Sequence, residues 1–122
     1  MGVPDPSARL VAVIDDEEMI LRALSRVLRL AGFEVKTFLS VDSFLAEPAG
    51  SPWAAVLLDL HMPGVRGHEV LEMLQGGMRL PVITMSGEPG ADRRLARGAI
   101  AHLAKPIDED VLVAALQQAF SA

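Results

Sequence analysis

In the stretch Ala54-Ala55-Val56-Leu57-Leu58-Asp59, five apolar residues lead directly into a single carboxylate. Two other apolar runs also end at charged side chains: Leu10–Ile14 is followed by the pair Asp15-Asp16, and Ile100–Ala104 is followed by Lys105. Short runs without polar interruption are typical of parallel strands that are covered on both faces. If these runs are neighbouring strands, three carboxylates and one ammonium group meet at one end of a sheet.

Segments with helical periodicity alternate with the apolar runs along the whole chain. Strands are predicted at residues 10–14, 33–38, 53–59, 80–85 and 100–104, and helices at residues 17–31, 41–46, 67–74, 91–97 and 108–120. This (βα)5 order predicts an α/β fold in which helices cover both faces of a parallel sheet. Ligands of such sheets bind beyond the carboxyl ends of the strands, which is where the charged residues lie.

The first predicted helix is amphipathic. Glu17 and Glu18 in its first turn and Gly32 after its last turn are typical of helix ends. The stripe expected to face the core comprises Met19, Ile20, Ala23, Leu24, Val27, Leu28 and Ala31, and the opposite face comprises Arg22, Ser25, Arg26 and Arg29. The methionines, including Met19 and Met73 on helical stripes, are interpreted as core filler.

Length and composition limit the classes of protein to which this chain can belong. The 122 residues are enough for one domain, predicted at residues 9–121 after a loose tail at residues 1–8, and the 51% hydrophobic content argues against disorder. The net charge of −5, without a cluster of basic residues, argues against a nucleic-acid-binding surface. The absence of cysteine excludes disulfides and thiolate metal sites, and fits a cytoplasmic location. No stretch is long and apolar enough for a membrane span, and no signal sequence precedes the domain.

The acidic cluster favours a divalent cation. Three carboxylates that lie close together repel one another, and either raised pKa values or a bound cation relieves the repulsion. A site made only of oxygen ligands, with few protein groups and room for water, suits Mg²⁺ better than Ca²⁺. Such an ion would offset the charge of an incoming phosphoryl group, which Asp59 could attack to form an acyl phosphate. Lys105 and Ser86 would then contact phosphate oxygens, and Gly87 would leave room beside them.

Each of these signals also has a purely structural explanation. An acidic run before a helix usually complements the helix dipole, and an Asp at the end of a strand is commonly a turn residue. Lys-Pro and Ser-Gly pairs are usually ordinary loop chemistry. The joint placement of the signals after the first, third, fourth and fifth predicted strands favours the functional interpretation.

Four motifs together resemble the receiver domain of bacterial two-component response regulators. They are Val13-Ile14-Asp15-Asp16-Glu17, Leu57-Leu58-Asp59-Leu60-His61-Met62-Pro63-Gly64 with Gly67, Pro81-Val82-Ile83-Thr84-Met85-Ser86-Gly87, and Lys105-Pro106. The resemblance covers about residues 9–121, and residues 33–38 and 43–45 are most similar to receivers of the FixJ group. It implies the doubly wound, flavodoxin-like fold: a three-layer sandwich with the strand order 2-1-3-4-5.

The resemblance also implies roles for the residues of the acidic cluster. Asp59 would be the phosphoacceptor. Asp16 would bind Mg²⁺ directly, Asp15 mostly through water, and the backbone carbonyl of His61 would complete the protein ligands together with Asp59.

Further roles follow for the residues around the phosphoryl group. Ser86 would be the switch hydroxyl, and Lys105 would pair with a phosphate oxygen, beside Gly87. The Lys105–Pro106 peptide bond is expected to be cis. His102 stands where receivers usually carry the Tyr or Phe that acts as the second switch residue, and imidazole, unlike those rings, ionises near neutral pH.

The spacing between Ser86 and Lys105 is shorter than the commonest receiver spacing. We place the missing residues of this shorter spacing in the predicted helix at residues 91–97. That helix belongs to the face through which receivers usually dimerise, so a phosphorylation-dependent dimer is expected only if the shortened face still pairs.

The function implied by the resemblance is a switch activated by phosphorylation, not a separate enzyme. A sensor histidine kinase or phosphotransfer protein would supply the phosphoryl group, and a downstream protein or an attached output domain would receive the signal. A binding module that works without phosphorylation remains an alternative, as does a receiver fragment of a larger transcription factor or hybrid kinase. A flavoprotein is disfavoured because Asp15-Asp16-Glu17-Glu18 would repel a phosphate at the loop after the first strand. A phosphatase with a catalytic aspartate is disfavoured because the D-x-D pattern of such enzymes does not occur after that strand.

Overall fold

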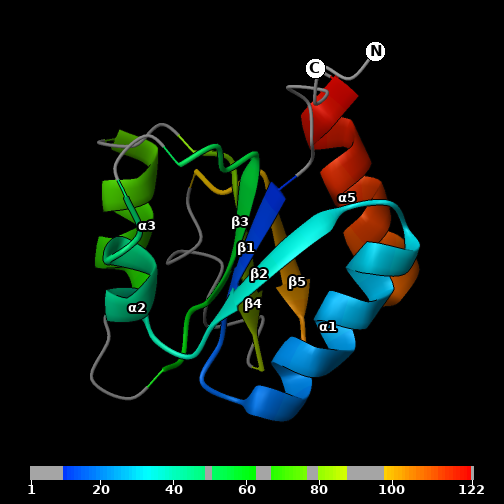
Figure 1. Ribbon diagram of the computed structural model, residues 1–122, viewed down its shortest axis with the longest axis horizontal. Helices are drawn as coiled ribbons and strands as arrows, with labels where there is room; N and C mark the ends of the chain where they lie inside the picture. Colours follow the sequence, from blue (N-terminus) through cyan, green and yellow to red (C-terminus); the bar gives the residue numbers. More distant parts are fainter. Residues whose placement is uncertain (1–9, 49–50, 63–66, 77–79, 88–97, 122) are drawn as a thin grey trace.

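A five-stranded parallel sheet forms the centre of the protein, in the order β2-β1-β3-β4-β5 (Figure 1). The computed structural model describes residues 10–48, 51–62, 67–76, 80–87 and 98–121. The strands are β1 (Leu10–Ile14), β2 (Glu34–Phe38), β3 (Ala55–Asp59), β4 (Val82–Ser86) and β5 (Ala101–Ala104). The predicted α/β fold and the strand order 2-1-3-4-5 are therefore confirmed.

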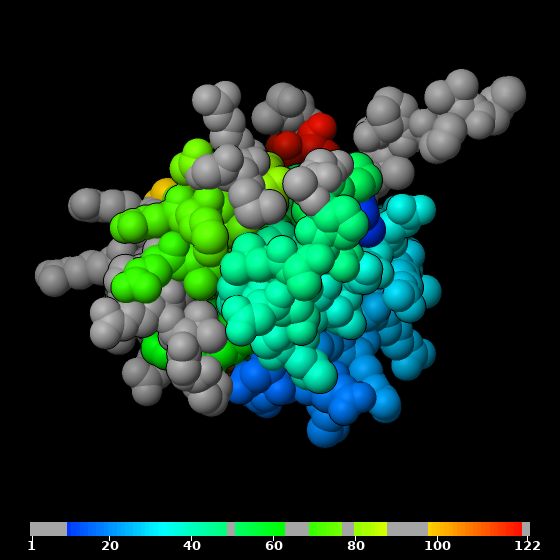
Figure 2. All heavy atoms as spheres, turned by 60° about the vertical axis from the view of Figure 1, so that its left-hand side comes forward, coloured from blue at the N-terminus to red at the C-terminus, as the bar shows by residue number. Residues whose placement is uncertain are grey.

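Helices cover both faces of the sheet. The described helices are α1 (Glu18–Leu30), α2 (Val41–Leu45), α3 (Gly67–Gly76) and α5 (Glu109–Ser121). Helices α2 and α3 lie on one side of the sheet and α1 and α5 on the other, which gives the three expected layers (Figure 1). Figure 2 shows the outer surface of the side formed by α2 and α3. The predicted helix at residues 91–97 and the predicted tail at residues 1–8 lie outside the described residues.

The three inner strands are apolar on both faces because both faces are covered. Every residue of β3 and β4 is buried, and so is every residue of β1 after Leu10. Alternate side chains enter two separate cores, one against α2 and α3 and the other against α1 and α5. The edge strand β2 is largely exposed, and the ion pair between its Lys36 and Glu47 lies at this edge.

The predicted inward stripe of α1 was wrong in part. The buried residues are Leu21, Leu24, Ser25 and Leu28, whereas Met19 is 83% exposed and Ala23 is exposed. The set 21, 24, 25 and 28 has the i, i+3, i+4, i+7 spacing of one helix face, turned relative to the predicted stripe. Ser25 therefore faces inward although it is polar. Met73 on α3 is also 41% exposed, so neither of these methionines fills the core.

The ends of the elements follow local chemistry. Ser40 caps α2, because its Oγ accepts a hydrogen bond from the backbone N–H of Ser43 at 3.1 Å. Gly32 follows α1 with φ +97°, a left-handed conformation that favours glycine. Within the described residues, no helix is both long and apolar enough to cross a bilayer.

Candidate functional site

The carboxyl ends of the strands bring the predicted charged residues together. Asp59 ends β3, Ser86 ends β4, and Asp15 and Lys105 directly follow β1 and β5. Because the four strands are parallel neighbours, these four residues lie at the same edge of the sheet. An open pocket of about 400 Å³ lies there, lined by Glu17, Asp59, His61, Gly87 and Lys105.

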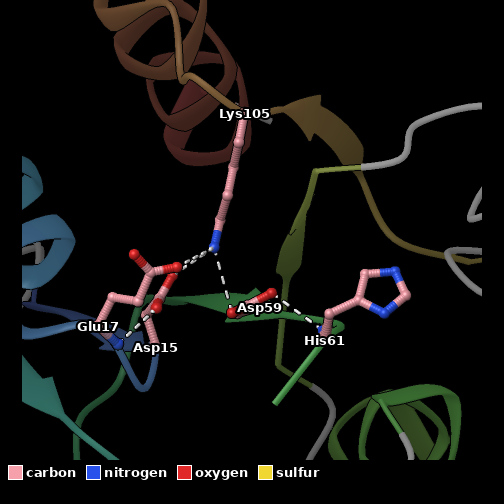
Figure 3. Close-up of polar contacts among 5 residues, drawn as sticks. All are labelled: Asp15, Glu17, Asp59, His61 and Lys105. Atoms are coloured by element: carbon pink, nitrogen blue, oxygen red, sulfur yellow. Dashed lines mark hydrogen bonds and ion pairs between the residues drawn. The ribbon is translucent and has the colours of Figure 1, made fainter.

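Lys105 is the centre of the charge cluster (Figure 3). Its Nζ lies 2.9 Å from Oδ2 of Asp15, 3.2 Å from Oδ2 of Asp59 and 4.0 Å from Oε1 of Glu17. The side chains of Asp15 and Asp59 are 0% and 2% exposed, and that of Lys105 is 17% exposed. The ammonium group thus offsets two buried carboxylates that would otherwise repel each other.

Burial and charge oppose each other in setting the pKa values of this pair. Burial raises the pKa of Asp15 above its usual value, and the nearby Asp59 adds to this, although the Glu17 N–H and Lys105 act in the opposite direction. For Lys105, burial acts to lower the pKa, but the contacts with Asp15 and Asp59 outweigh it and the pKa is raised. Lys105 therefore remains charged at neutral pH.

Backbone groups orient the two buried carboxylates. The N–H of His61 donates to Oδ1 of Asp59 at 3.0 Å, and the N–H of Glu17 donates to Oδ1 of Asp15 at 2.9 Å. In each carboxylate one oxygen is held by the backbone two residues further on, and the other faces Lys105 (Figure 3). Both carboxylates are thus held in fixed orientations toward Lys105.

Asp15, Asp16 and Glu17 form an all-oxygen donor set. Their carboxylate oxygens can lie within 4.8 Å of one another, with Asp15 buried and the other two exposed. This is the ligand chemistry that Mg²⁺ prefers, and the exposed side leaves space for its waters. The residues therefore fit a magnesium ion.

Glu17 was not among the predicted site residues. Its place in the first turn of a helix explained it as a dipole complement, yet its carboxylate reaches Lys105 and lines the pocket. Its position next to Asp15-Asp16 in the sequence was the signal that could have identified it.

Ser86 ends β4, between the neighbouring strands β3 and β5, and Gly87 after it lines the pocket with Asp59 and Lys105. Ser86 is completely buried, and its backbone oxygen accepts a hydrogen bond from the N–H of Lys105 at 2.8 Å. Gly87 is exposed, and an added Cβ would meet no atom within 4 Å. Open space therefore lies beside Gly87, which lines the pocket. The Lys105–Pro106 bond is cis, as predicted.

His102 is partly buried on β5, opposite Thr84 of β4. The Nδ1 of His102 lies 2.7 Å from Oγ1 of Thr84, a hydrogen-bond distance. Thr84 was quoted only as part of a motif, so sequence reasoning missed this partner.

Comparison with known proteins agrees with this geometry. The family model described as the response regulator receiver domain matches residues 11–117. The chain belongs to this family. Receiver domains are signalling domains and not a known enzyme family, and the matched segment contains every residue of the pocket.

Three full-length relatives place the receiver domain within larger regulators. TodT, a response regulator protein of Pseudomonas putida, is 32% identical over 92% of this chain and 51% of its own length. KdpE, a transcriptional regulatory protein of Mycobacterium tuberculosis, is 37% identical over 90% of this chain and 50% of its own. FixJ, a transcriptional regulatory protein of Rhizobium meliloti, is 32% identical over 89% and 55%. The chain thus spans about half the length of these relatives.

Solved receiver structures share the fold over nearly the whole chain. A receiver domain protein from Clostridium thermocellum matches with a TM-score of 0.78 and 26% identity, covering 93% of this chain and 94% of the other. A receiver protein from Pseudoalteromonas atlantica matches with a TM-score of 0.79 and 27% identity, covering 92% and 97%.

Proposed function

We propose that this receiver domain is a switch that accepts a phosphoryl group on Asp59, with Mg²⁺, from a histidine kinase or phosphotransfer protein. The observation that carries the proposal is the buried Asp59 carboxylate, 3.2 Å from the Lys105 ammonium in a pocket rimmed by further carboxylates. Family membership supports the same function. The domain assists its own phosphorylation and dephosphorylation.

The transfer requires one bond to form and one to break. A lone pair of an Asp59 oxygen forms the O–P bond, and the P–N bond of the donor phosphohistidine breaks, with its electron pair returning to the imidazole. The N–H of His61 keeps Oδ1 of Asp59 in place, and the Lys105 ammonium is near enough to pair with an oxygen of the arriving group. Ser86 would donate a hydrogen bond to another oxygen, with Gly87 leaving room.

Magnesium, when bound, would neutralise charge on the phosphoryl oxygens. Asp15, Asp16 and Asp59, with the backbone carbonyl of His61, are the proposed ligands. The exposed carboxylate of Glu17 lies in the same donor set and would act beside them. Because Lys105 pairs with Asp15 and Asp59, it would share these carboxylates with the ion.

A surface groove next to the pocket offers a docking place for the phosphoryl donor. It has a volume of about 260 Å³ and is lined by Ile20, Ala23, Leu24 and Val27 of α1 and by Lys105, Pro106, Ile107 and Glu109. Lys105 lines both the groove and the pocket. A donor whose apolar surface covers the groove would therefore bring its phosphohistidine to Asp59.

The switch would act on a downstream protein or an attached output domain. It would act in the cytoplasm, where a histidine kinase or phosphotransfer protein meets it. The printed names of the relatives, response regulator and transcriptional regulatory proteins, support an output of this kind. We assign the domain to residues 9–121. We propose that it contacts neither nucleic acid nor membrane directly. Pairing of two phosphorylated copies is one way in which it would signal.

The decisive test is mass spectrometry after incubation with acetyl phosphate and Mg²⁺. The unaltered protein should gain about 80 Da, as expected for one covalent phosphoryl group. Asp59→Asn should gain no mass, because the nucleophilic carboxylate is lost. Asp42→Asn, which alters an exposed carboxylate on α2, is the matched control and should be labelled normally. Equal labelling of Asp59→Asn, or no labelling of the unaltered protein, would leave the phosphorylation-independent binding module as the better proposal.

A further inference from the structure

Thr84 of β4 and His102 of β5 form a polar pair in the sheet, two residues before Ser86 on β4. Thr84 is 0% exposed in the middle of β4, where a hydroxyl group without a partner would be costly. Its Oγ1 lies 2.7 Å from Nδ1 of His102, and a longer contact of 3.5 Å joins it to the backbone oxygen of Ala101. The short contact therefore satisfies the hydroxyl through the side chain of the neighbouring strand.

Strand geometry places this pair on the same face as Ser86. Thr84 and His102 are direct partners in the parallel ladder, and Ser86 and Ala104 are the next pair on that face. Ile83, Met85 and Leu103, which alternate with them, enter the core formed with α1 and α5. Thr84, Ser86 and His102 therefore face the opposite side, where α3 lies (Figure 1).

The bond is compatible with both charge states of the imidazole. A threonine hydroxyl donates and accepts. With a neutral ring, Oγ1–H can donate to Nδ1; with a charged ring, Nδ1–H donates to Oγ1 and the hydroxyl proton turns toward the Ala101 oxygen. The contact therefore holds the ring whether or not it carries a proton.

We propose that Thr84 is a positioning residue that tethers the imidazole of His102 and sets how readily this side chain leaves the α3 side of the sheet. Rotation of His102 away from Thr84 would leave the buried hydroxyl with only the longer 3.5 Å contact to the Ala101 oxygen, which disfavours the rotated state roughly five- to tenfold in population. The inference deepens the proposed function: movement of Ser86 toward a phosphoryl group would be reported at β5 by release of this tether.

The tether is tested first in the protein without phosphate, by ¹⁵N NMR of the His102 ring. The His102→Gln variant identifies its signals among the three histidines. Thr84→Val keeps the branched shape and removes the hydroxyl, so the Nδ1 signal should move and the rotated population should rise roughly five- to tenfold. Thr84→Ser should restore the original signal, and Thr37→Val, the same change on the exposed part of β2, should have no effect. Identical His102 signals in Thr84→Val and the unaltered protein would overturn the proposal.

A second measurement does not depend on the folding of a variant. In the unaltered protein, the Thr84 hydroxyl proton should exchange slowly with water, because it is buried and bonded. Fast exchange of this proton would also overturn the tether.

The link to phosphorylation is tested by adding beryllofluoride, an analogue of the phosphoryl group, with Mg²⁺. The His102 signals of the unaltered protein should shift, and in Thr84→Val part of this shift should be present beforehand, in proportion to its larger rotated population. Shifts of equal size in the two proteins would overturn the link. If Asp59 does not bind the analogue, the proposed function fails, while the tether is still judged from the spectra recorded without it.

Discussion

At the scale of single residues, Lys105 has two tasks that its position explains. It neutralises Asp15 and Asp59, at 2.9 and 3.2 Å, and it lines the pocket in which a phosphoryl group would arrive. A buried carboxylate without a partner is costly, so the lysine stabilises the fold as well as the site. Stability and the proposed function therefore depend on the same ammonium group.

Removal of the Lys105 charge should change how the unfolding free energy depends on pH. The folded protein binds the Lys105 proton more tightly than the unfolded chain does, because its pKa is raised above 10.5. The stability that follows from this is fully present below pH 10.5 and is lost as the pH rises through the raised pKa. We expect the urea-unfolding free energy of the unaltered protein to fall in this alkaline range, and that of Lys105→Met to be lower at neutral pH and to lack this part of the fall.

The control for this prediction is Lys36→Met. Lys36 lies on the edge strand β2 with a side chain 54% exposed, and its partner Glu47 lies at the surface edge of the molecule. Its loss should leave the alkaline fall in place, because an exposed ion pair contributes little. If the unfolding free energies of Lys105→Met and Lys36→Met depend on pH in the same way, Lys105 does not have the stabilising role assigned to it.

At the scale of secondary structure, α1 shows how a helix divides its apolar residues between two tasks. Leu21 and Leu28 contribute to the core, whereas Leu24 does so and also lines the groove next to Lys105 with other apolar residues of the helix. The sequence alone predicted a single stripe, because both sets are apolar and adjacent on the helix surface. Only the position of the neighbouring segment 105–109 distinguishes the set that lines the groove.

This division predicts unequal effects of the same kind of truncation. Leu28→Ala should lower the unfolding free energy by about 2–5 kcal/mol, because Leu28 is 0% exposed and leaves a cavity. Met19→Ala should change it by less than about 0.5 kcal/mol, because Met19 is 83% exposed. Urea unfolding followed by the fluorescence of Trp53, the single tryptophan, measures both. Similar losses would show that α1 is turned differently about its axis.

At the scale of the whole molecule, the sheet gathers side chains from distant parts of the sequence at one edge. Asp15, Asp59 and Lys105 are separated by tens of residues, yet they meet because β1, β3 and β5 are parallel and end together. A ligand that binds this edge therefore stabilises the folded chain as a unit.

Magnesium should accordingly raise the stability of the protein. At a concentration 100 times its Kd, the ion should add about 2.7 kcal/mol to the unfolding free energy. Asp16→Asn should reduce this gain, since one ligand oxygen is replaced by an amide, and Asp42→Asn should retain it. Thermal unfolding with and without Mg²⁺ gives the comparison. A gain that is the same in Asp16→Asn as in the unaltered protein would remove Asp16 from the proposed ligands.

Much of the fold was predictable because its signals are local. The strand Leu10–Ile14 was predicted with its observed bounds, and the other strands within about two residues, since uninterrupted apolar runs mark buried parallel strands. The positions of Asp15, Asp59 and Lys105 after their strands followed from the same runs.

The contacts of the site residues depended on the tertiary structure. The bond between Thr84 and His102 joins two residues whose sequence neighbourhoods carry no sign of each other. The inward orientation of Ser25 likewise has no signal in the sequence, and for Glu17 the neighbouring Asp15-Asp16 pair was the one available signal. The sequence alone determined which segments form strands and which charges stand at their ends, because periodicity and composition are properties of short segments. Only the packed molecule decided which side chains touch, because the turn of a helix about its axis and the partner across a strand depend on elements far away in the chain.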